Sequence, residues 1–204
     1  MSVEHNGVSY RVADAHAHIY PGKIAVKATD SVGDFYQIPM QNVGLPHVLA
    51  ERGAEAGIER FLGCSVATKV EQVIGLAAWH QDVEDIAGEM DDIQRRGLRG
   101  IKLHPDFQKF HIDDECMIPV YQEAHRRGLP VLFHTGDSRT DYSSPVRLMH
   151  VIEKIPEFTC IAAHLGGYSE WADARRELSG TNVYIDTSSS LFSITPEQAR
   201  ENIE

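Results

Sequence analysis

The chain has 204 residues, 42% of them hydrophobic and 24% charged, which is an ordinary composition for a soluble globular protein. Acidic residues outnumber basic ones by 30 to 19, a formal net charge of −11, and this argues against nucleic-acid binding, which requires a basic surface. The absence of a signal-peptide pattern, of any apolar run of about 18 residues and of a disulfide framework predicts a cytoplasmic protein with no membrane span.

Seven strands are expected along the chain, and from residue 82 onward they alternate clearly with helices. Their expected ranges are 10–19, 59–67, 74–80, 98–104, 130–135, 158–164 and 182–187. The continuous apolar runs are typical of a parallel sheet that is covered on both faces. The alternation predicts a single α/β domain over residues 1–204, for which a (β/α)₈ TIM-type barrel is the first candidate.

The connection after the first strand, residues 21–46, has no strong periodicity and is long for a loop. Loops of that length are usually functional or disordered. We therefore expect this segment to form a lid over a site.

Two expected helices end in the same four residues. These helices span 83–96 and 115–127, and the sequence RRGL stands at 95–98 and 126–129. Paired arginines suit the negative end of a helix dipole, and the glycine that follows suits a left-handed cap. The repeat predicts the same turn from helix into strand at both places.

The barrel is expected to be a shortened one. Only TKVEQV separates the second and third expected strands, whereas a parallel crossover needs about a dozen residues or more, so one crossover helix is missing. The chain closes with a helix that starts at a capping box, Thr195 to Gln198, and no eighth strand follows. An open sheet edge is an aggregation liability, so we expect a homo-oligomer or poor behaviour as a monomer.

An acid and two imidazoles stand close together in DAHAHIY, residues 14–20. Because side chains alternate along a strand, Asp14, His16 and His18 are expected on one face. Other polar residues stand at the carboxyl ends of later expected strands, which form the active-site mouth of an α/β barrel. These residues are Lys102, His104, His134, His164 and Asp186. His80 ends the expected third strand and is set aside, because that strand is the least regular one.

Three imidazoles with one open position are typical of a catalytic zinc site, where bound water has a pKa of about 7. His16 and His18 share one strand, and His134 is the best-placed third ligand. A single histidine after an apolar run is more often a hydrogen-bonded core residue. The pair on one strand, with two further histidines at strand ends, favours a metal site instead.

Five motifs in order, DAHAHIY, GIKLHP, PVLFHTG, AAHLGG and NVYIDTSS, resemble the amidohydrolase superfamily. The resemblance is to its amidohydrolase-2 branch, related to aminocarboxymuconate-semialdehyde decarboxylase, and it covers nearly the whole chain. The HxH motif alone is weak, but five ordered motifs are specific. The resemblance implies a metal-dependent (β/α)₈ barrel.

By match to the family's motifs, His16 and His18 would be metal ligands from strand one, and His134 the ligand from strand five. His164 would be the catalytic histidine of strand six, which binds a second metal or polarises the metal-bound water or substrate. Asp14 would support the histidine ligands by fixing their ring orientation, or else be a simple turn acid.

Lys102 stands where some superfamily members carry a carboxylated lysine that bridges two metals; otherwise it pairs with an acid at the barrel end. We expect one Zn²⁺ or another divalent transition ion, and two if Lys102 is carboxylated. His104 is expected to face the substrate or to be structural. Arg139 and Arg147 are interpreted as surface charges, the alternative being contact with an anionic substrate.

These residues predict a metal-dependent hydrolase of the amidohydrolase type, in which metal-bound water attacks a C–N, C–O or lactone carbonyl of a small molecule. His164 would stabilise the developing charge. One alternative is a metal-dependent non-oxidative decarboxylase of a small aromatic or enoic acid, because the same ligands serve both reactions. The family's strand-eight aspartate has no counterpart, since Asp186 belongs to strand seven, and this favours a third reading, a truncated non-catalytic metal-binding or interaction protein.

Overall fold

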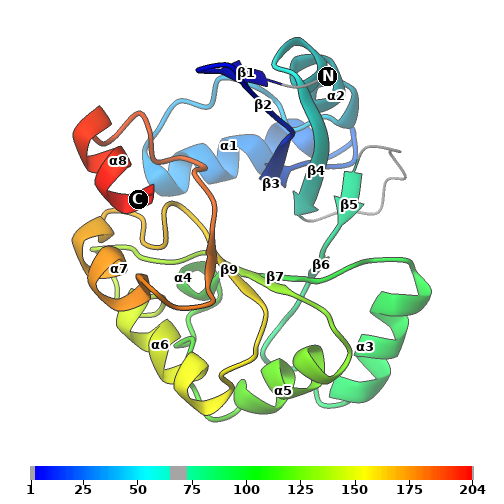
Figure 1. Ribbon diagram of the computed structural model, residues 1–204. Coiled ribbons are helices and arrows are strands. Elements are labelled where there is room, and N and C mark those ends of the chain that lie inside the picture. The colour runs from blue at the N-terminus through cyan, green and yellow to red at the C-terminus, as the bar shows by residue number, and fades with distance from the viewer. Residues whose placement is uncertain (1–2, 65–72, 204) are drawn as a thin grey trace. The chain divides into compact units, whose positions relative to one another are not determined.

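The computed structural model describes residues 3–64 and 73–203 of the chain (Figure 1). The fold divides into two compact units, Met1–Ala77 and Ala78–Glu204, which are described separately. Apart from one N-terminal hairpin, every strand pairing given for the described residues is parallel. The α/β architecture expected from the sequence is therefore confirmed.

The first unit begins with an antiparallel hairpin of β1 (Val3–His5) and β2 (Val8–Tyr10). A parallel sheet follows, with the order β3 (Val12–His18), β4 (Ile58–Cys64) and β5 (Val73–Gly75). Figure 1 shows β3 and β4 side by side, so the carboxyl end of β3 lies beside that of β4.

Two helices connect β3 to β4, namely α1 (Ala25–Tyr36) and α2 (Pro46–Glu55). The expectation of a loop over 21–46 is therefore wrong for its middle part. Only Ala25 and Thr29 of α1 are fully buried, and both are small, so the inward face of the helix gives a weak hydrophobic signal in the sequence. A lid function for this segment stays a prediction. The predicted lack of a crossover helix concerns TKVEQV, most of which lies outside the described residues.

The expected strand over 74–80 is two short strands. β5 ends at Gly75, and β6 (Ala77–Ala78) begins at the boundary of the two units. The backbone N–H of Leu76 donates to Gly63 O at 2.9 Å, whereas that of Trp79 donates to Lys102 O at 3.4 Å. The ladder thus changes partner within five residues, which a local sequence pattern does not reveal.

The second unit holds a five-stranded sheet with the order β10-β9-β8-β7-β6. Its further strands are β7 (Ile101–Leu103), β8 (Val131–Phe133), β9 (Cys160–Ala162) and β10 (Tyr184–Ile185). They are shorter than expected because only the apolar centre of each run enters the ladder. The polar residues at the carboxyl ends belong to the loops that follow.

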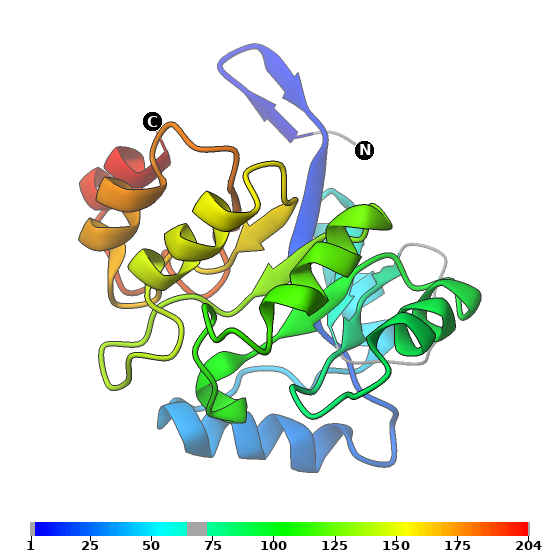
Figure 2. The same cartoon turned by 90° about the horizontal axis from the view of Figure 1, so that it is seen from below.

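Helices of the second unit lie along this sheet, and α5 (Ile118–Arg126) and α6 (Pro145–Lys154) cover β8 and β9 (Figure 2). The other helices are α3 (Ile86–Arg95), α4 (Pro105–Gln108), α7 (Trp171–Leu178) and α8 (Pro196–Ile203). The capping box predicted for α8 is confirmed, because Thr195 and Gln198 exchange hydrogen bonds of 2.9 and 3.2 Å.

The two RRGL turns have the predicted form. Gly97 and Gly128 adopt φ values of +78° and +65°, which favour glycine. After each glycine, the leucine N–H reaches back five residues into the helix: Leu98 donates to Ile93 O at 3.1 Å, and Leu129 donates to Ala124 O at 2.9 Å. Local sequence therefore determined both helix ends.

The core of the second unit is built around Tyr121, Phe133 and Phe158, all fully buried. Tyr121 packs edge-on against Phe133 with ring centroids 5.4 Å apart, and its hydroxyl donates to Ile112 O at 2.9 Å. Burial raises the pKa of Tyr121 well above its usual range. This core fixes α5 against β8 and so holds the strand that directly precedes His134.

The strand pairings do not form a closed barrel within the described part of the chain, since β3 and β10 are each the last strand of a sheet. No helix in that part is long and apolar enough to cross a bilayer.

Candidate metal centre

Four polar residues stand directly after strands of the second unit. His104 follows β7, His134 follows β8, His164 comes two residues after β9, and Asp186 follows β10. The strands are parallel neighbours, so their carboxyl ends share one edge of the sheet. The structure thus confirms that these strands end in polar groups at one edge.

The loops after β8 and β9 are in close contact. Gly136 has φ +75°, and a Cβ there would lie 2.6 Å from the backbone carbon of Gly167. The N–H of Tyr168 donates to Thr135 O at 2.7 Å. Only glycine permits this approach, which brings the histidines at the two strand ends together.

His134 and His164 form a buried pair. Nδ1 of His134 lies 3.0 Å from Nε2 of His164, and the two residues are 2% and 7% exposed to solvent, respectively. Nδ1 of His164 lies 2.9 Å from Ser188 O and 3.1 Å from Ser188 Oγ. The two rings and Ser188 therefore form one continuous hydrogen-bonded chain.

Asp186 anchors this hydrogen-bonded chain of side chains by accepting three hydrogen bonds. Its Oδ1 accepts the backbone N–H of His164 at 3.0 Å, and the N–H and Oγ–H of Ser188 at 2.9 and 2.6 Å. His164 adopts φ +63°, an uncommon backbone conformation for a residue with a side chain. Its carbonyl also accepts Trp171 Nε1–H at 3.0 Å. These contacts stabilise a turn that the residue alone disfavours.

The hydrogen-bonded chain determines which nitrogens carry protons when both imidazoles are neutral. A carbonyl oxygen only accepts, so Nδ1 of His164 is the donor to Ser188 O, and its Nε2 bears a lone pair. Nδ1 of His134 must then donate to that lone pair, and Nε2 of His134 bears a lone pair in turn. A neutral imidazole that carries its lone pair on Nε2 and is held through its other nitrogen is the form that ligates a metal.

His104 stacks face to face on His134, with ring centroids 3.9 Å apart and an angle of 9° between the planes. It caps α4, where its Nδ1 accepts the N–H of Phe107 at 3.4 Å. In the neutral ring the other nitrogen, Nε2, is therefore a donor. Lys102 is buried within β7, two residues before His104.

Asp106 ends the stretch His104-Pro105-Asp106, which the sequence predicts at the barrel mouth as substrate-facing or structural, and it is buried beside His134. Its two oxygens accept the hydroxyls of Thr140 and Ser143, and its Oδ2 lies 3.8 Å from His134 Nε2. Burial raises the pKa of Asp106, against the lowering effect of the two hydroxyl groups. The sequence indicated its place directly after β7, but not its contact with His134.

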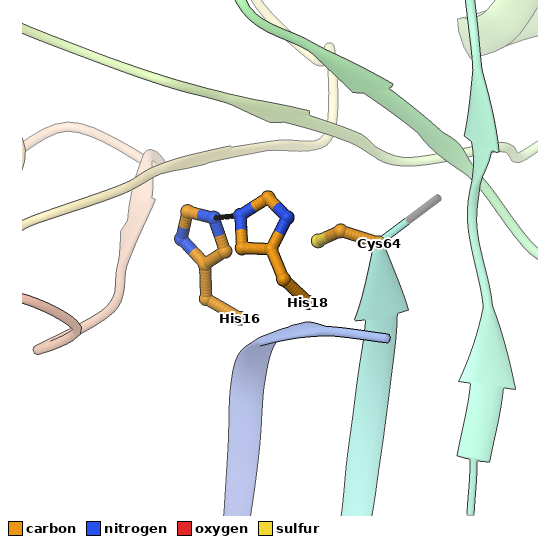
Figure 3. A group of neighbouring side chains, drawn as sticks. All are labelled: His16, His18 and Cys64. Carbon is orange, nitrogen blue, oxygen red and sulfur yellow. Dashed lines mark hydrogen bonds between the residues drawn. The ribbon is translucent and has the colours of Figure 1, made fainter. Parts of the chain in front are cut away.

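In the first unit, His16 and His18 face each other on β3, with their Nε2 atoms 3.0 Å apart (Figure 3). The pairing of β3 with β4 is irregular between Asp14 and Ala17, so the expected alternation is interrupted, yet both rings still point to one place. Asp14 Oδ1 accepts the backbone N–H of His16 at 2.8 Å. In this structure Asp14 thus supports the main chain of His16.

Cys64 is the third potential ligand in the first unit. It ends β4 opposite His18, and its Sγ lies within 4.8 Å of ligand nitrogens of His16 and His18. Figure 3 shows the thiol beside the His18 ring. The residue is buried and forms no disulfide. Its place at the carboxyl end of strand two was a usable signal that the histidine pattern overshadowed.

The other charged residues considered are paired with acids outside these clusters. Arg139 forms two hydrogen bonds with Asp137, of 2.8 and 2.6 Å. Arg147 bridges Asp113 and Asp141, at 2.8 and 2.6 Å. His80 is exposed and lies 3.5 Å from Asp82, in keeping with its being set aside.

Solved structures share this fold at low sequence identity. An uncharacterized TIM-barrel protein from Bordetella bronchiseptica is 18% identical with a TM-score of 0.70, over 93% of this chain and 79% of that one. A probable 2-pyrone-4,6-dicarboxylic acid hydrolase from Acinetobacter baumannii, with citric acid bound, is 11% identical with a TM-score of 0.60, over 93% and 75%. A 5-carboxyvanillate decarboxylase from Novosphingobium aromaticivorans, with bound manganese, is 13% identical with a TM-score of 0.56, over 77% and 66%.

No curated protein matches the chain by sequence. The family model described as Amidohydrolase matches residues 13–204, which is nearly the whole chain. The likeness to TIM-barrel structures agrees with the barrel-type fold. Members of this family are enzymes that bind a divalent metal, and the histidine and aspartate groups described above could hold one. The chain belongs to the amidohydrolase family, in its amidohydrolase-2 branch.

Proposed function

We propose that this protein is a metal-dependent hydrolase in which His16, His18 and His134 hold one divalent cation. The observation that carries the proposal is the hydrogen-bonded chain that leaves a lone pair on His134 Nε2 and holds the ring through its other nitrogen. The order of the sequence motifs, together with the family match, supports assigning His134 and the strand-one histidines to the same ion.

The spacing of the strand-one histidines supports the same assignment. Two imidazole nitrogens on one tetrahedral Zn²⁺, each about 2.0–2.1 Å from the metal, are roughly 3.3 Å apart. The Nε2 atoms of His16 and His18 are 3.0 Å apart, so a small adjustment accommodates an ion. Cys64 is an additional candidate donor to this pair.

When bound, a divalent cation supplies an acidified water and a Lewis acid for a carbonyl oxygen. His164 then acts through His134, because its Nε2 faces the Nδ1 of that ring. His104, with Nε2–H as a donor, is the group we assign to hydrogen-bond a substrate oxygen. Lys102 stays a predicted substrate-binding residue. Its alternative role, as a carboxylated lysine that bridges two metals in some family members, also stays a prediction.

Non-oxidative decarboxylation is the second candidate reaction. The fold likeness to a manganese-containing 5-carboxyvanillate decarboxylase favours it, since the same cation and the same His104 donor suit a carboxylated substrate. The two reactions differ in product: hydrolysis consumes water at a carbonyl, whereas decarboxylation releases CO₂ and protonates carbon.

The test is metal analysis combined with a substrate panel of amides, esters, lactones and aromatic acids. We expect at least one carbonyl substrate to be turned over, with activity lost to a chelator and restored by Zn²⁺ or Mn²⁺. His134→Ala should lower metal affinity at least about 10–100-fold, whereas His150→Ala, an exposed histidine paired with Asp113, should not.

Three outcomes decide between the alternatives. CO₂ release without hydrolysis would establish the decarboxylase. Stoichiometric metal without turnover of any substrate would favour the non-catalytic protein. A metal-free protein whose stability is unaffected by chelators would contradict the metal site itself.

A further inference from the structure

Asp106 and His134 present two buried acceptors to each other. With both imidazoles of the His134–His164 pair neutral, the lone pair on His134 Nε2 lies 3.8 Å from the carboxylate oxygen Oδ2 of Asp106. The two side chains are only 3% and 0% exposed, so water does little to screen them. A buried carboxylate oxygen and an imidazole nitrogen at this separation can both bind one cation that lies between them.

The surroundings of Asp106 fix its carboxylate without neutralising it. Thr140 and Ser143 each donate a hydroxyl hydrogen to one of its oxygens, and a carboxylate oxygen has a second lone pair for a further partner. A hydroxyl group carries no charge. The negative charge of Asp106 therefore still lacks a cationic counterpart in these contacts.

His104 is not a third ligand of a cation held by Asp106 and His134. Its ligand atom lies within 4.8 Å of those of Asp106 and His134, but its ring is parallel to that of His134 at 3.9 Å. Nitrogens of two stacked rings point along parallel planes, so one ion cannot lie in both ring planes. The pair of Asp106 and His134 is thus the cation-binding part of this cluster.

We propose that Asp106 is a carboxylate ligand of the same divalent ion as His134, an inference that rests on the proposed function. Zn²⁺ lies about 2.0–2.1 Å from a histidine nitrogen and about 2.0–2.2 Å from a carboxylate oxygen, so two such ligands are at most about 4.3 Å apart. The separation of 3.8 Å meets this limit. Asp106 contributes the negative charge that three neutral imidazoles lack.

The competing explanation is that Asp106 only ties down the loop that carries Thr140 and Ser143. The two explanations predict opposite results for two variants of the full-length protein. Asp106→Asn keeps the shape and removes the charge, and we expect its zinc affinity by calorimetry to fall at least about 10–100-fold. The double variant Thr140→Ala/Ser143→Ala removes the ties and keeps the charge, and its zinc affinity should remain within a few-fold of wild type.

A second measurement reports the contact directly and does not depend on activity. In Asp106→Cys loaded with Co²⁺, a thiolate ligand gives a sulfur-to-cobalt charge-transfer band beyond any that wild type shows, because thiolate binds such ions strongly. We expect this additional band, and we expect His134→Ala in the same background to weaken it. The Cys variant keeps the test decisive if the Asn variant does not fold.

Failure of this inference is distinguishable from failure of the proposed function. Wild-type metal affinity and cobalt spectrum in Asp106→Asn, together with no additional band in Asp106→Cys, would overturn the role of Asp106 while leaving the histidine site intact. Absence of zinc binding by wild type would overturn both. An affinity loss in the double variant as large as that in Asp106→Asn would assign Asp106 to loop anchoring instead.

Discussion

The orientation of His134 depends on residues that lie 30 or more positions away in sequence. The ring is held by His164, His164 is held by Ser188, and Asp186 accepts from both the His164 backbone and the Ser188 hydroxyl. Partners of this kind fix the tautomer of a ligating histidine, and their loss typically costs about 10–100-fold in metal affinity.

Asp186→Ala tests this at the level of a single residue. Alanine removes the oxygen that accepts three hydrogen bonds, so the His164 turn loosens and zinc affinity should fall about 10–100-fold, with helical content unchanged by circular dichroism. Asp137→Ala is the matched control, because Asp137 is also buried but bonds to Arg139. Equal affinities for the two variants would show that Asp186 does not position the ligand.

The sequence identifies individual site residues better than it identifies their partners. His134, His164 and Asp186 could be placed at strand ends because apolar runs mark the strands. The roles of Asp106 and Ser188 depend on contacts between separate loops, which no local spacing encodes. Cys64 was missed for another reason: the histidine pattern drew attention away from its place at the carboxyl end of an apolar strand.

Helix α5 shows how charge supports an element. Glu123 accepts hydrogen bonds from Arg126 and Arg127, at distances from 2.6 to 2.7 Å, and Arg127 also pairs with Asp91 on α3. The hydrogen bonds from Arg126 and Arg127 lower the pKa of Glu123 to about 2 from its usual 4.5. An acid whose folded-state pKa is lowered adds stability above its unfolded pKa, and this is lost as the pH falls.

Glu123→Gln should therefore destabilise the protein at pH 7 and have little effect near pH 2. The stability difference should shrink as the pH falls from about 4.5 to about 2, measured as the shift in urea midpoint between variant and wild type. Glu153→Gln, an exposed position on α6, is the control. A midpoint shift for Glu123→Gln that is independent of pH would contradict the ionic origin of the effect.

At the level of elements, prediction succeeded where local chemistry decides. The RRGL turns and the capping box of α8 follow from a few neighbouring residues. Strand limits were overestimated because ladder hydrogen bonds, which depend on the neighbouring strand, end before the apolar run does. Helix α1 was missed because its inward positions, such as Ala25, Ala28 and Thr29, are small residues that give only a weak hydrophobic signal.

For the whole molecule, the alternation of strands and helices was enough to predict an α/β barrel type, and the ordered motifs were enough to predict the family. The central claim is the proposal that His16, His18 and His134 hold one ion. The His16–His18 pair and the His134–His164 pair are each preorganised by contacts of their own.

The most direct measurement is a crystal structure of the zinc-loaded protein, with the ion located by anomalous scattering. The account predicts one ion per chain, contacted by Nε2 of His16, His18 and His134. An ion held by His16, His18 and Cys64 with His134 elsewhere, or separate ions in the two units, would contradict the account.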